Sequence, residues 1–306
     1  MDQYTKKTKI WLEQRFSAVD ESGIYIAHQP IYGFHGFHCE PALIEKYIRT
    51  YQIMKTLAQL EFGSFLDAGG AEGYRAGLVR RFFGVQSRSC DLSEEACKRA
   101  RDIFGIDSDA ADLHNLPYRD GSFDVVLCSE SIEHLPDFKA GVRELLRIAR
   151  NALIVTVPHE SQESVAHGLD EHIPHGHLHS FDLASFDFLK HEGYSVSSRR
   201  IVSPHLSLLA SLLPIKNIEQ GSRFPETIYR VYNAAVPLLK KLQSNWVAAA
   251  LIQLDEKLCA ISSRYNAALF VILKEPSASL KENKKQISAK QIVEFRVPYH
   301  EIGHRR

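Results

Sequence analysis

The spacing of apolar residues changes partway along this chain of 306 residues. Before residue 62, apolar side chains recur every three or four positions, most regularly between Ile44 and Ala58. That period is typical of a helix with one buried face. We therefore expect helices over 1–20 and 40–61, joined by a loop at 31–38 that is rich in glycine and aromatic residues.

From residue 64 onward, short apolar runs alternate with amphipathic stretches. The apolar runs predict strands over 64–70, 85–93, 123–130, 151–158 and 194–203. The amphipathic stretches predict helices over 73–84, 93–105, 137–150 and 181–193, with Ser93 as an N-cap. Strands and helices that alternate in this way form a mostly parallel sheet with helices on both faces and right-handed connections.

The alternation stops at residue 204, where three helical patterns precede one more strand at 265–275. We therefore divide the chain into a helical N-terminal cap, a core, a helical insert, a last core strand and a polar tail: 1–60, 61–203, 204–262, 263–276 and 277–306. The insert is expected to be a lid, a substrate cap or a dimer surface, and the oligomeric state stays open. Within the tail, 292–297 has the pattern of a short strand.

Composition narrows the class of protein. Lysine plus arginine and aspartate plus glutamate number 37 each, which argues against a large, sequence-independent nucleic-acid surface. No apolar run reaches the roughly 18 residues of a membrane span, and the first residues lack the apolar stretch of a signal peptide. Five scattered cysteines without CxxC spacing suit reduced thiols. We therefore expect a cytoplasmic protein.

The segment from Asp67 to Gly73 combines an acid with glycines directly after an apolar strand. Glycines let a backbone turn sharply and approach a ligand closely, and the following helix directs its N-terminal amides to the same place. The candidates for contact with a nucleotide-like ligand are Asp67, Gly69, Gly70 and Gly73. An ordinary tight strand–helix turn has the same pattern, so the turn alone does not decide between the two.

Polar residues follow the next strands in order. Asp91 ends the second predicted strand, where an acid can accept hydrogen bonds from the two hydroxyls of a ribose. Asp112 follows a third strand, which the alternation places between the predicted helix at 93–105 and Asp112, and it can meet an adenine amino group while Leu113 packs on the ring. The fourth strand carries Ser129 and Glu130 to the same edge of the sheet. Each acid alone is more often a surface carboxylate, but their order at successive strand ends favours a nucleotide-like ligand.

This order of residues resembles the class I S-adenosylmethionine-dependent methyltransferases, in particular the small-molecule group that includes the ubiquinone-biosynthesis O-methyltransferases. The matching segments within residues 60–203 are Asp67–Gly73, Asp91, Asp112–Pro117 and Phe123–Leu135. The resemblance implies an α/β fold with a Rossmann-like, seven-stranded, mostly parallel sheet, helices on both faces, and the helical insert before the last strand.

The same resemblance implies roles for individual residues. Those that would contact S-adenosylmethionine, from the methionine part through the ribose and the adenine to the sulfonium, are Gly69, Gly73, Asp91, Leu92, Asp112, Leu113, Ser129 and Glu130. Ala71 departs from the family pattern, which has its middle glycine there. We expect the extra methyl group to reduce the room near the methionine part without abolishing binding.

A hydroxyl acceptor would need a base. The sulfonium methyl is already a strong electrophile, so the protein chiefly aligns the acceptor and removes its proton, for which histidine is suited near neutral pH. His134 follows the fourth strand, His159 follows the fifth, and His177 and His179 precede the next predicted helix. We take His134, His177 and His159 as the main candidates for the catalytic base. The alternative for each is a loop histidine or a helix cap.

A divalent metal is a further interpretation of the same region. Glu130, Glu133 and His134 place three oxygen or nitrogen ligands within five residues, and His177 would complete the set. This spacing resembles the metal site of small-RNA 2′-O-methyltransferases and of some ubiquinone O-methyltransferases. Such a metal could bind paired acceptor hydroxyls and lower their pKa, and the ligand types suit magnesium, manganese or zinc. In many metal-free relatives the equivalent Glu133 and His134 are structural, so both interpretations stand.

The sequence thus predicts an S-adenosylmethionine-dependent methyltransferase that acts on a small-molecule, glycan-linked or lipid-linked acceptor, with oxygen as the favoured acceptor atom. One alternative is a metal-dependent RNA 2′-O-methyltransferase, which the neutral charge disfavours. Another is a cofactor-binding partner protein without catalytic activity, for which Ala71 is the motive. No specific nucleic acid is expected as a partner. Short apolar stretches in 204–262 allow a peripheral membrane contact, although a packed helical subdomain is favoured.

Overall fold

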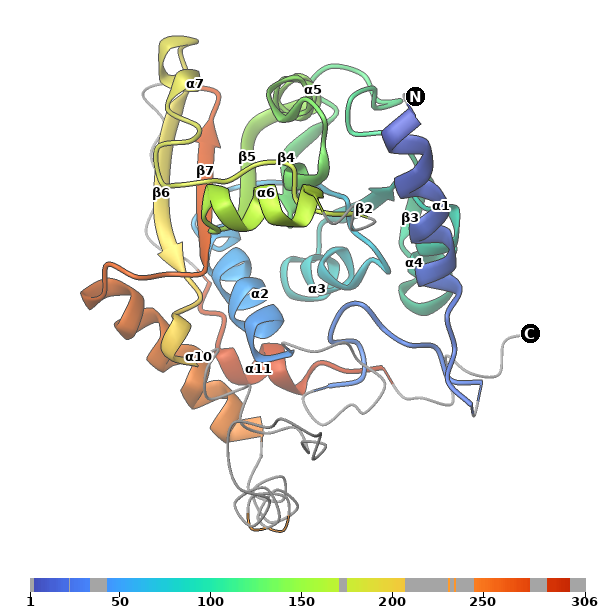
Figure 1. The fold of residues 1–306 in the computed structure, drawn as a ribbon, viewed down its shortest axis with the longest axis vertical. Helices are drawn as coiled ribbons and strands as arrows, with labels where there is room; N and C mark the ends of the chain where they lie inside the picture. The colour runs from blue at the N-terminus through green and yellow to red at the C-terminus, as the bar shows by residue number, and fades with distance from the viewer. Residues whose placement is uncertain are drawn as a thin grey trace.

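The computed structural model describes residues 3–21, 23–33, 43–170, 175–206, 231, 234, 245–275 and 285–297. Its strands are β1 (Ser64–Ala68), β2 (Gln86–Asp91), β3 (Asp107–Ala110), β4 (Phe123–Ser129), β5 (Ala149–Pro158), β6 (Ser195–Ile201) and β7 (Ala267–Leu273). Its helices are α1 (Gln3–Ser17), α2 (Leu43–Leu57), α3 (Tyr74–Phe83), α4 (Glu94–Phe104), the 3-10 helix η1 (Ile132–His134), α5 (Phe138–Ile148), α6 (Gln162–Asp170), α7 (Phe188–His191), α10 (Asn245–Ile261) and α11 (Ala289–Glu294). Figure 1 shows their arrangement around the sheet.

The seven strands form one sheet in the order β3-β2-β1-β4-β5-β7-β6. β7 pairs antiparallel with β5 and β6, whereas β1 to β5 pair in parallel. The predicted seven-stranded, mostly parallel sheet is therefore confirmed. The strand order reverses between β1 and β4, and such a reversal opens a crevice at the carboxyl ends of the two strands.

Both faces of the sheet are buried. Successive side chains of a strand point to opposite faces, so neighbours in sequence belong to different cores. Phe65 of β1 and Leu127 of β4 pack in one cluster with α2, α3 and α10, whereas Leu66 and Val126 pack in a second cluster with α5. This double burial explains why β4 and β7 read as nearly continuous apolar runs.

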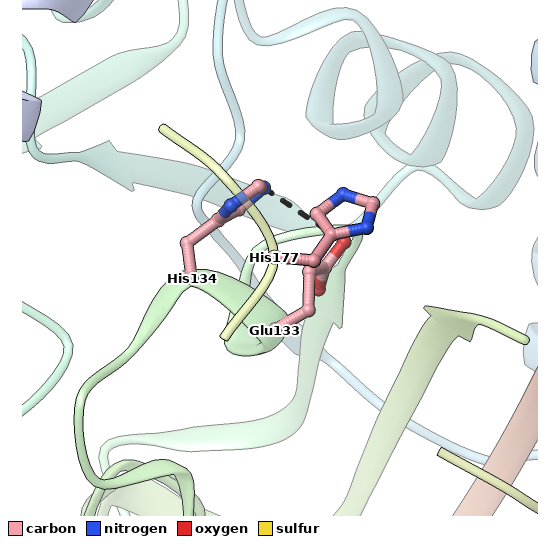
Figure 2. A group of neighbouring side chains, drawn as sticks. All are labelled: Glu133, His134 and His177. Carbon is pink, nitrogen blue, oxygen red and sulfur yellow. Dashed lines mark ion pairs between the residues drawn. The ribbon is translucent and has the colours of Figure 1, made fainter. Parts of the chain in front are cut away.

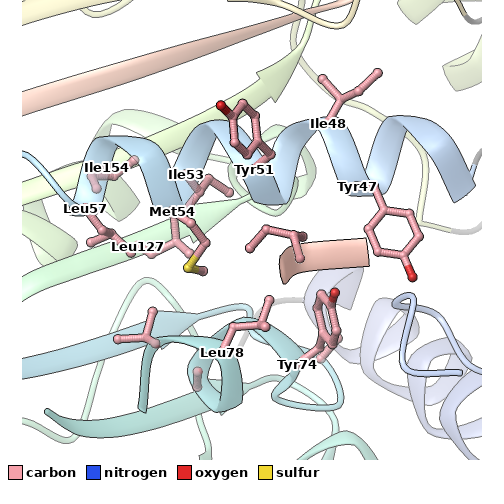
Figure 3. Close-up of a cluster of buried hydrophobic side chains, with 14 of the residues drawn as sticks. Tyr47, Ile48, Tyr51, Ile53, Met54, Leu57, Tyr74, Leu78, Leu127 and Ile154 are labelled. Carbon is pink, nitrogen blue, oxygen red and sulfur yellow. The ribbon is translucent and has the colours of Figure 1, made fainter. Parts of the chain in front are cut away.

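Helix α2 is part of the first of these cores. Ile48, Ile53 and Met54 are fully buried, and Ile44 and Leu57 near its two ends are buried as well. Figure 3 shows the apolar face of α2 against the sheet residues Leu127 and Ile154. Since burial of one large apolar side chain contributes about 1.5–3 kcal/mol, this face holds α2 in place.

The C-terminal segment differs from its prediction. Residues 292–297 were expected to form a short strand, but 289–294 form α11. The hydroxyl of Ser288 accepts a hydrogen bond from the N–H of Gln291, and the Gln291 side chain accepts one from the N–H of Ser288. This reciprocal capping box starts a helix, and burial of Ile292 and Val293 holds it against the core.

The helix predicted over 181–193 is also shorter than expected, since turns precede α7. Asp182 accepts a hydrogen bond from the N–H of Ala184, which favours the turn over the helix. In the insert, the last predicted helix is confirmed as α10, which packs on α2, α11 and β6. The other two predicted helices lie largely outside the described residues. Among the helices that the structure describes, none combines the length and the apolar character needed to cross a bilayer.

Candidate active site

A cavity lies between α1 and the carboxyl ends of the first four strands, and we call it the main cavity. It encloses about 780 Å³ of space, including its open mouth. The strand ends and the loops that follow them supply Gly69, Ala71, Asp91, Leu92, Ala111, Asp112, Leu113, Glu130 and Ser131. Helix α1 supplies Tyr4, Thr5, Thr8, Trp11, Leu12, Arg15 and Phe16. The predicted strand-end residues and the N-terminal helix therefore form one hollow.

The glycine turn after β1 needs its glycines for steric reasons. Gly69 has φ of 74°, and a Cβ atom there would lie 2.2 Å from Oγ of Ser131. Gly73 has φ of 77°, and a Cβ atom there would lie 2.7 Å from Cβ of Ala100. Gly69 lines the main cavity, whereas Gly70 and Gly73 shape the turn behind it.

Ala71 occupies the middle of this turn with φ of 47°, in the left-handed region that glycine adopts more easily. Its N–H donates to Oδ2 of Asp91 over 3.0 Å, and its side chain lines the main cavity. The methyl group that distinguishes this turn from the family pattern therefore lies at the cavity wall.

Asp91 is held firmly at the end of β2. Its two oxygens accept hydrogen bonds from the N–H groups of Ala71 and Ser93, each over 3.0 Å. Burial raises the pKa of Asp91 to about 6, against the opposing effect of these hydrogen bonds. Asp67 lies behind the turn and is fully buried, and burial likewise raises its pKa to about 6. Asp91 therefore faces the main cavity, while Asp67 is buried behind the turn.

Asp112 and Leu113 form another part of the wall. Oδ1 of Asp112 accepts a hydrogen bond from the N–H of His114 over 2.9 Å, which fixes the side chain in a tight turn. Leu113 lies with Leu135 and Pro136 along the same cavity. A carboxylate beside an apolar surface is the combination that was predicted for an adenine.

Glu130, directly after β4, has φ of 55°. Oε2 of Glu130 lies 3.1 Å from Nε of Arg49, and Oε1 accepts a hydrogen bond from the hydroxyl of Thr156 over 3.2 Å. Ser129, by contrast, is buried with its Oγ 2.7 Å from Oγ1 of Thr156. Glu130 and Ser131 line the main cavity, while Ser129 supports the strand end from behind.

Helix α1 is fixed over the main cavity by Glu13. The Glu13 carboxylate accepts hydrogen bonds from the N–H groups of Glu94 and Glu95, over 2.7 and 3.0 Å, and from the hydroxyl of Ser93. These groups are the N-terminus of α4, where a negative charge is favoured. At the other end of α1, the hydroxyl of Tyr4 donates to the carbonyl oxygen of Gly176 over 3.2 Å.

Glu72, within the glycine turn, is a second attachment point for the N-terminal region. It is fully buried and accepts a hydrogen bond from the hydroxyl of Tyr25 over 3.0 Å and another from the N–H of His28. His28 itself lines the main cavity. Glu72 therefore holds the segment after α1 against the turn.

Three histidine rings lie in series at the edge of the main cavity. The ring centres of His134 and His175 are 3.5 Å apart, and those of His134 and His177 are 5.0 Å apart. Nδ1 of His134 lies 3.1 Å from the carbonyl oxygen of Gly176. A carbonyl oxygen only accepts, so Nδ1 carries the proton and Nε2 has a free electron pair. Burial lowers the pKa of His134 well below its usual range, so the ring is neutral near pH 7.

Glu133, His134 and His177 are brought together as the sequence predicted. Each offers one ligand atom, and these atoms all lie within 4.8 Å of one another. Figure 2 shows that Glu133 and His134 project from η1 and that His177 comes from a separate segment. Glu130, the fourth predicted ligand, is instead engaged by Arg49.

Two further carboxylates lie close to this cluster. Burial raises the pKa of Glu133 well above its usual range, and the nearby Glu130 raises it further. Among the described residues, Oε2 of Glu133 has no hydrogen-bond partner. Nδ1 of His177 contacts the carboxylate of Glu160, and His177 is the main cause of the lowered pKa of Glu160. A carboxylate behind an imidazole is a common arrangement at metal sites.

The other predicted histidines lie elsewhere. His159 is exposed, its ring stacks on Tyr265 with centres 4.2 Å apart, and its Nδ1 is 2.6 Å from the carbonyl oxygen of Phe181. Nε2 of His179 lies 2.7 Å from the carbonyl oxygen of Leu135. Neither residue lines the main cavity.

Several residues at the site were not predicted from the sequence. Trp11, Arg15, His28 and His175 line the main cavity, and Glu160 contacts His177. Their sequence positions carry little signal, because each reaches the site through the packing of distant segments. The concentration of histidines between 159 and 179 was visible, but their pairing was not.

Comparison with known proteins agrees with this geometry. Residues 66–154 match a family described as a methyltransferase domain. The chain is 38% identical over 93 residues to norajmaline N-methyltransferase of Rauvolfia serpentina, a match that covers 28% of this chain and 32% of that protein. It is 30% identical over 129 residues to chloroplastic tocopherol O-methyltransferase of Arabidopsis thaliana, covering 39% and 37% of the two chains. The matched region spans only about a third of these relatives.

A solved structure resembles nearly the whole fold. The [4+2]-cyclase SpnF matches with a TM-score of 0.50 and 17% identity, over 88% of this chain and 93% of that protein. At that identity the likeness concerns the fold alone. For residues 66–154, the domain match agrees with the methyltransferase domain that the sequence predicted.

Proposed function

We propose that this chain, which contains a class I S-adenosylmethionine-dependent methyltransferase domain, transfers the methyl group of that cofactor to a hydroxyl of a small molecule. The observation that carries the proposal is the main cavity, in which Gly69, Asp91, Asp112, Glu130 and His134 meet. Both relatives described above are methyltransferases named for small molecules, one acting at nitrogen and one at oxygen. A neutral histidine at the cavity edge supports oxygen, because a hydroxyl must lose its proton.

Asp91 would bind the ribose. Its oxygens are fixed by two backbone N–H groups, and each oxygen keeps an electron pair that can accept from a hydroxyl. Asp112 would accept from the adenine amino group, with Leu113 against the ring. Arg15 lines the same cavity from α1, and its guanidinium suits the carboxylate of the methionine part.

His134 would be the base. The bound cofactor supplies the electrophilic methyl group. The Gly176 carbonyl holds the Nδ1 proton of His134, which leaves Nε2 to accept the acceptor's proton. Burial keeps the ring neutral.

A matched pair of histidine substitutions tests this role. We expect His134→Asn to lower kcat by about 10²- to 10⁴-fold, the usual contribution of a general base, with affinity for S-adenosylhomocysteine unchanged. His159→Asn is the control, because His159 lies outside the main cavity. Turnover would be followed on a panel of hydroxylated small molecules. Wild-type kcat in His134→Asn would remove His134 from the mechanism.

A second candidate is a metal-assisted form of the same transfer. It is favoured by the convergence of Glu133, His134 and His177 and by the buried Glu133 oxygen that lacks a partner among the described residues. These three residues would hold the ion, and Glu160 would orient His177. An ion bound there lowers the pKa of an acceptor hydroxyl. His134 would then be a ligand and could not be the base.

Metal analysis of the same proteins separates the two candidates. Wild-type protein would be equilibrated with Mn²⁺ or Zn²⁺, dialysed against metal-free buffer and analysed for bound metal. One ion per chain that is lost in Glu133→Gln supports the metal-assisted form. Absence of bound metal, with activity retained after chelation, leaves His134 as the base.

A further inference from the structure

A second hollow lies next to the main cavity, between α1 and the residues Gly168, Leu169 and 175–178, and we call it the outer groove. It encloses about 1110 Å³ including its mouth. Tyr4, Thr8, Trp11 and His175 line both the main cavity and the outer groove. The two hollows therefore meet at the edge where the His134 and His175 rings stack.

The outer groove is mainly apolar and open to solvent. Ile10 on α1 and Leu169 at the end of α6 line it, although 61% and 44% of their surfaces are exposed. Leu178 and Trp11 continue this surface toward the main cavity. Exposed apolar side chains gathered in a hollow gain free energy when an apolar ligand covers them.

The inner end of the outer groove is built from flat rings. Trp11 stacks on His175 with ring centres 5.0 Å apart and planes 22° apart, and His175 stacks in turn on His134. Ring faces of this kind pack well against another planar ring. Within the lining that the structure describes, no residue is acidic, and Lys7 lies exposed near the rim. A cationic amine would find no carboxylate among these lining residues.

We propose that the outer groove holds the body of the methyl acceptor, and that this acceptor is a planar, largely apolar ring compound carrying a hydroxyl. The inference rests on the proposed function and specifies its substrate class. The ring body lies along Ile10, Trp11 and Leu169, and the hydroxyl edge points to the junction with the main cavity. Selectivity for the acceptor then comes from α1 and α6, outside the strand ends that form the cofactor part of the site.

The test uses 2-naphthol, a planar apolar compound with one hydroxyl, as ligand and as acceptor. Trp246→Phe leaves Trp11 as the remaining tryptophan of the chain, so quenching of its fluorescence reports binding in either hollow, and substitutions at Ile10 and Leu169 assign that binding to the outer groove. We expect saturable quenching, and about tenfold or greater weakening by Ile10→Glu and by Leu169→Glu, because either carboxylate would be desolvated by the ring. Ile261→Glu is the control, since Ile261 is 83% exposed and lies outside the outer groove.

S-adenosylhomocysteine affinity, measured on each protein, separates a failure of the acceptor assignment from a failure of the cofactor assignment. If wild-type protein binds S-adenosylhomocysteine but 2-naphthol does not quench Trp11 saturably, the acceptor assignment is overturned while the cofactor assignment stands. Equal 2-naphthol affinity in Ile10→Glu, Leu169→Glu and Ile261→Glu also overturns it. If wild-type protein does not bind S-adenosylhomocysteine, the proposed function fails, and the inference built on it fails too.

Discussion

At the scale of single residues, Ala71 illustrates how a departure from a family pattern can be absorbed. Its φ of 47° lies in the left-handed region of backbone conformation, which residues with a Cβ atom adopt at an energetic cost. The hydrogen bond from its N–H to Asp91 depends on that same conformation. The turn therefore keeps the geometry that a glycine would give, and the strain is stored in the folded state.

We expect Ala71→Gly to stabilise the protein by about 0.5–1 kcal/mol, because relief of the strained φ outweighs the greater flexibility of the unfolded chain. Gly84→Ala is the opposite control, since Gly84 has φ of 70° and, among the described residues other than its neighbours in the chain, none has an atom within 4 Å of an added Cβ. Gly84→Ala should lower the stability of the protein by an amount similar to the gain expected for Ala71→Gly. Denaturant unfolding of both variants checks this, and a destabilised Ala71→Gly would contradict the strain assigned to Ala71.

At the scale of elements, the attachment of α1 decides whether the main cavity is complete. Burial alone would raise the pKa of Glu13, but the hydrogen bonds from Glu95, Glu94 and Ser93, with the charge of Lys9, lower it below the usual value. Glu13 is therefore ionised near neutral pH and acts as a charged cap for α4. Because α1 carries Trp11 and Arg15, this cap couples α4 to both hollows.

Glu13→Gln keeps the size of the side chain and removes its charge. We expect the loss of about 0.5–2 kcal/mol of capping energy to loosen α1 and to weaken binding of S-adenosylhomocysteine. Hydrogen exchange of the α1 peptide should become several-fold faster, while Lys6→Gln, on an exposed position of the same helix, leaves it unchanged. Wild-type exchange rates in Glu13→Gln would show that α1 is held by other contacts.

At the scale of the whole molecule, the sequence predicted those elements and strand-end residues whose positions depend on short, local patterns. The strands, Ser93 as a cap and the acids at strand ends follow from periodicity and spacing, and the structure gathers Asp91, Asp112 and Glu130 in one cavity. The cavity wall from α1 was not predictable, because its inward face mixes Thr5 and Thr8 with apolar residues. The Glu160–His177 contact and the position of His175 depend on how distant segments pack, which no short pattern encodes.

We propose that the main cavity binds S-adenosylmethionine through Asp91. Calorimetric titration of S-adenosylhomocysteine into wild-type protein, Asp91→Asn and Asp109→Asn tests it most directly. Asp109 is the control, because it lies on the neighbouring strand β3, pairs with Arg88 over 2.9 Å and does not line the main cavity. We expect one molecule bound per chain, with about 10- to 100-fold weaker binding in Asp91→Asn alone, as loss of hydrogen bonds to a charged acceptor implies. Equal affinity in all three proteins, or no binding to the wild type, would contradict the assignment of Asp91 and the main cavity to the cofactor.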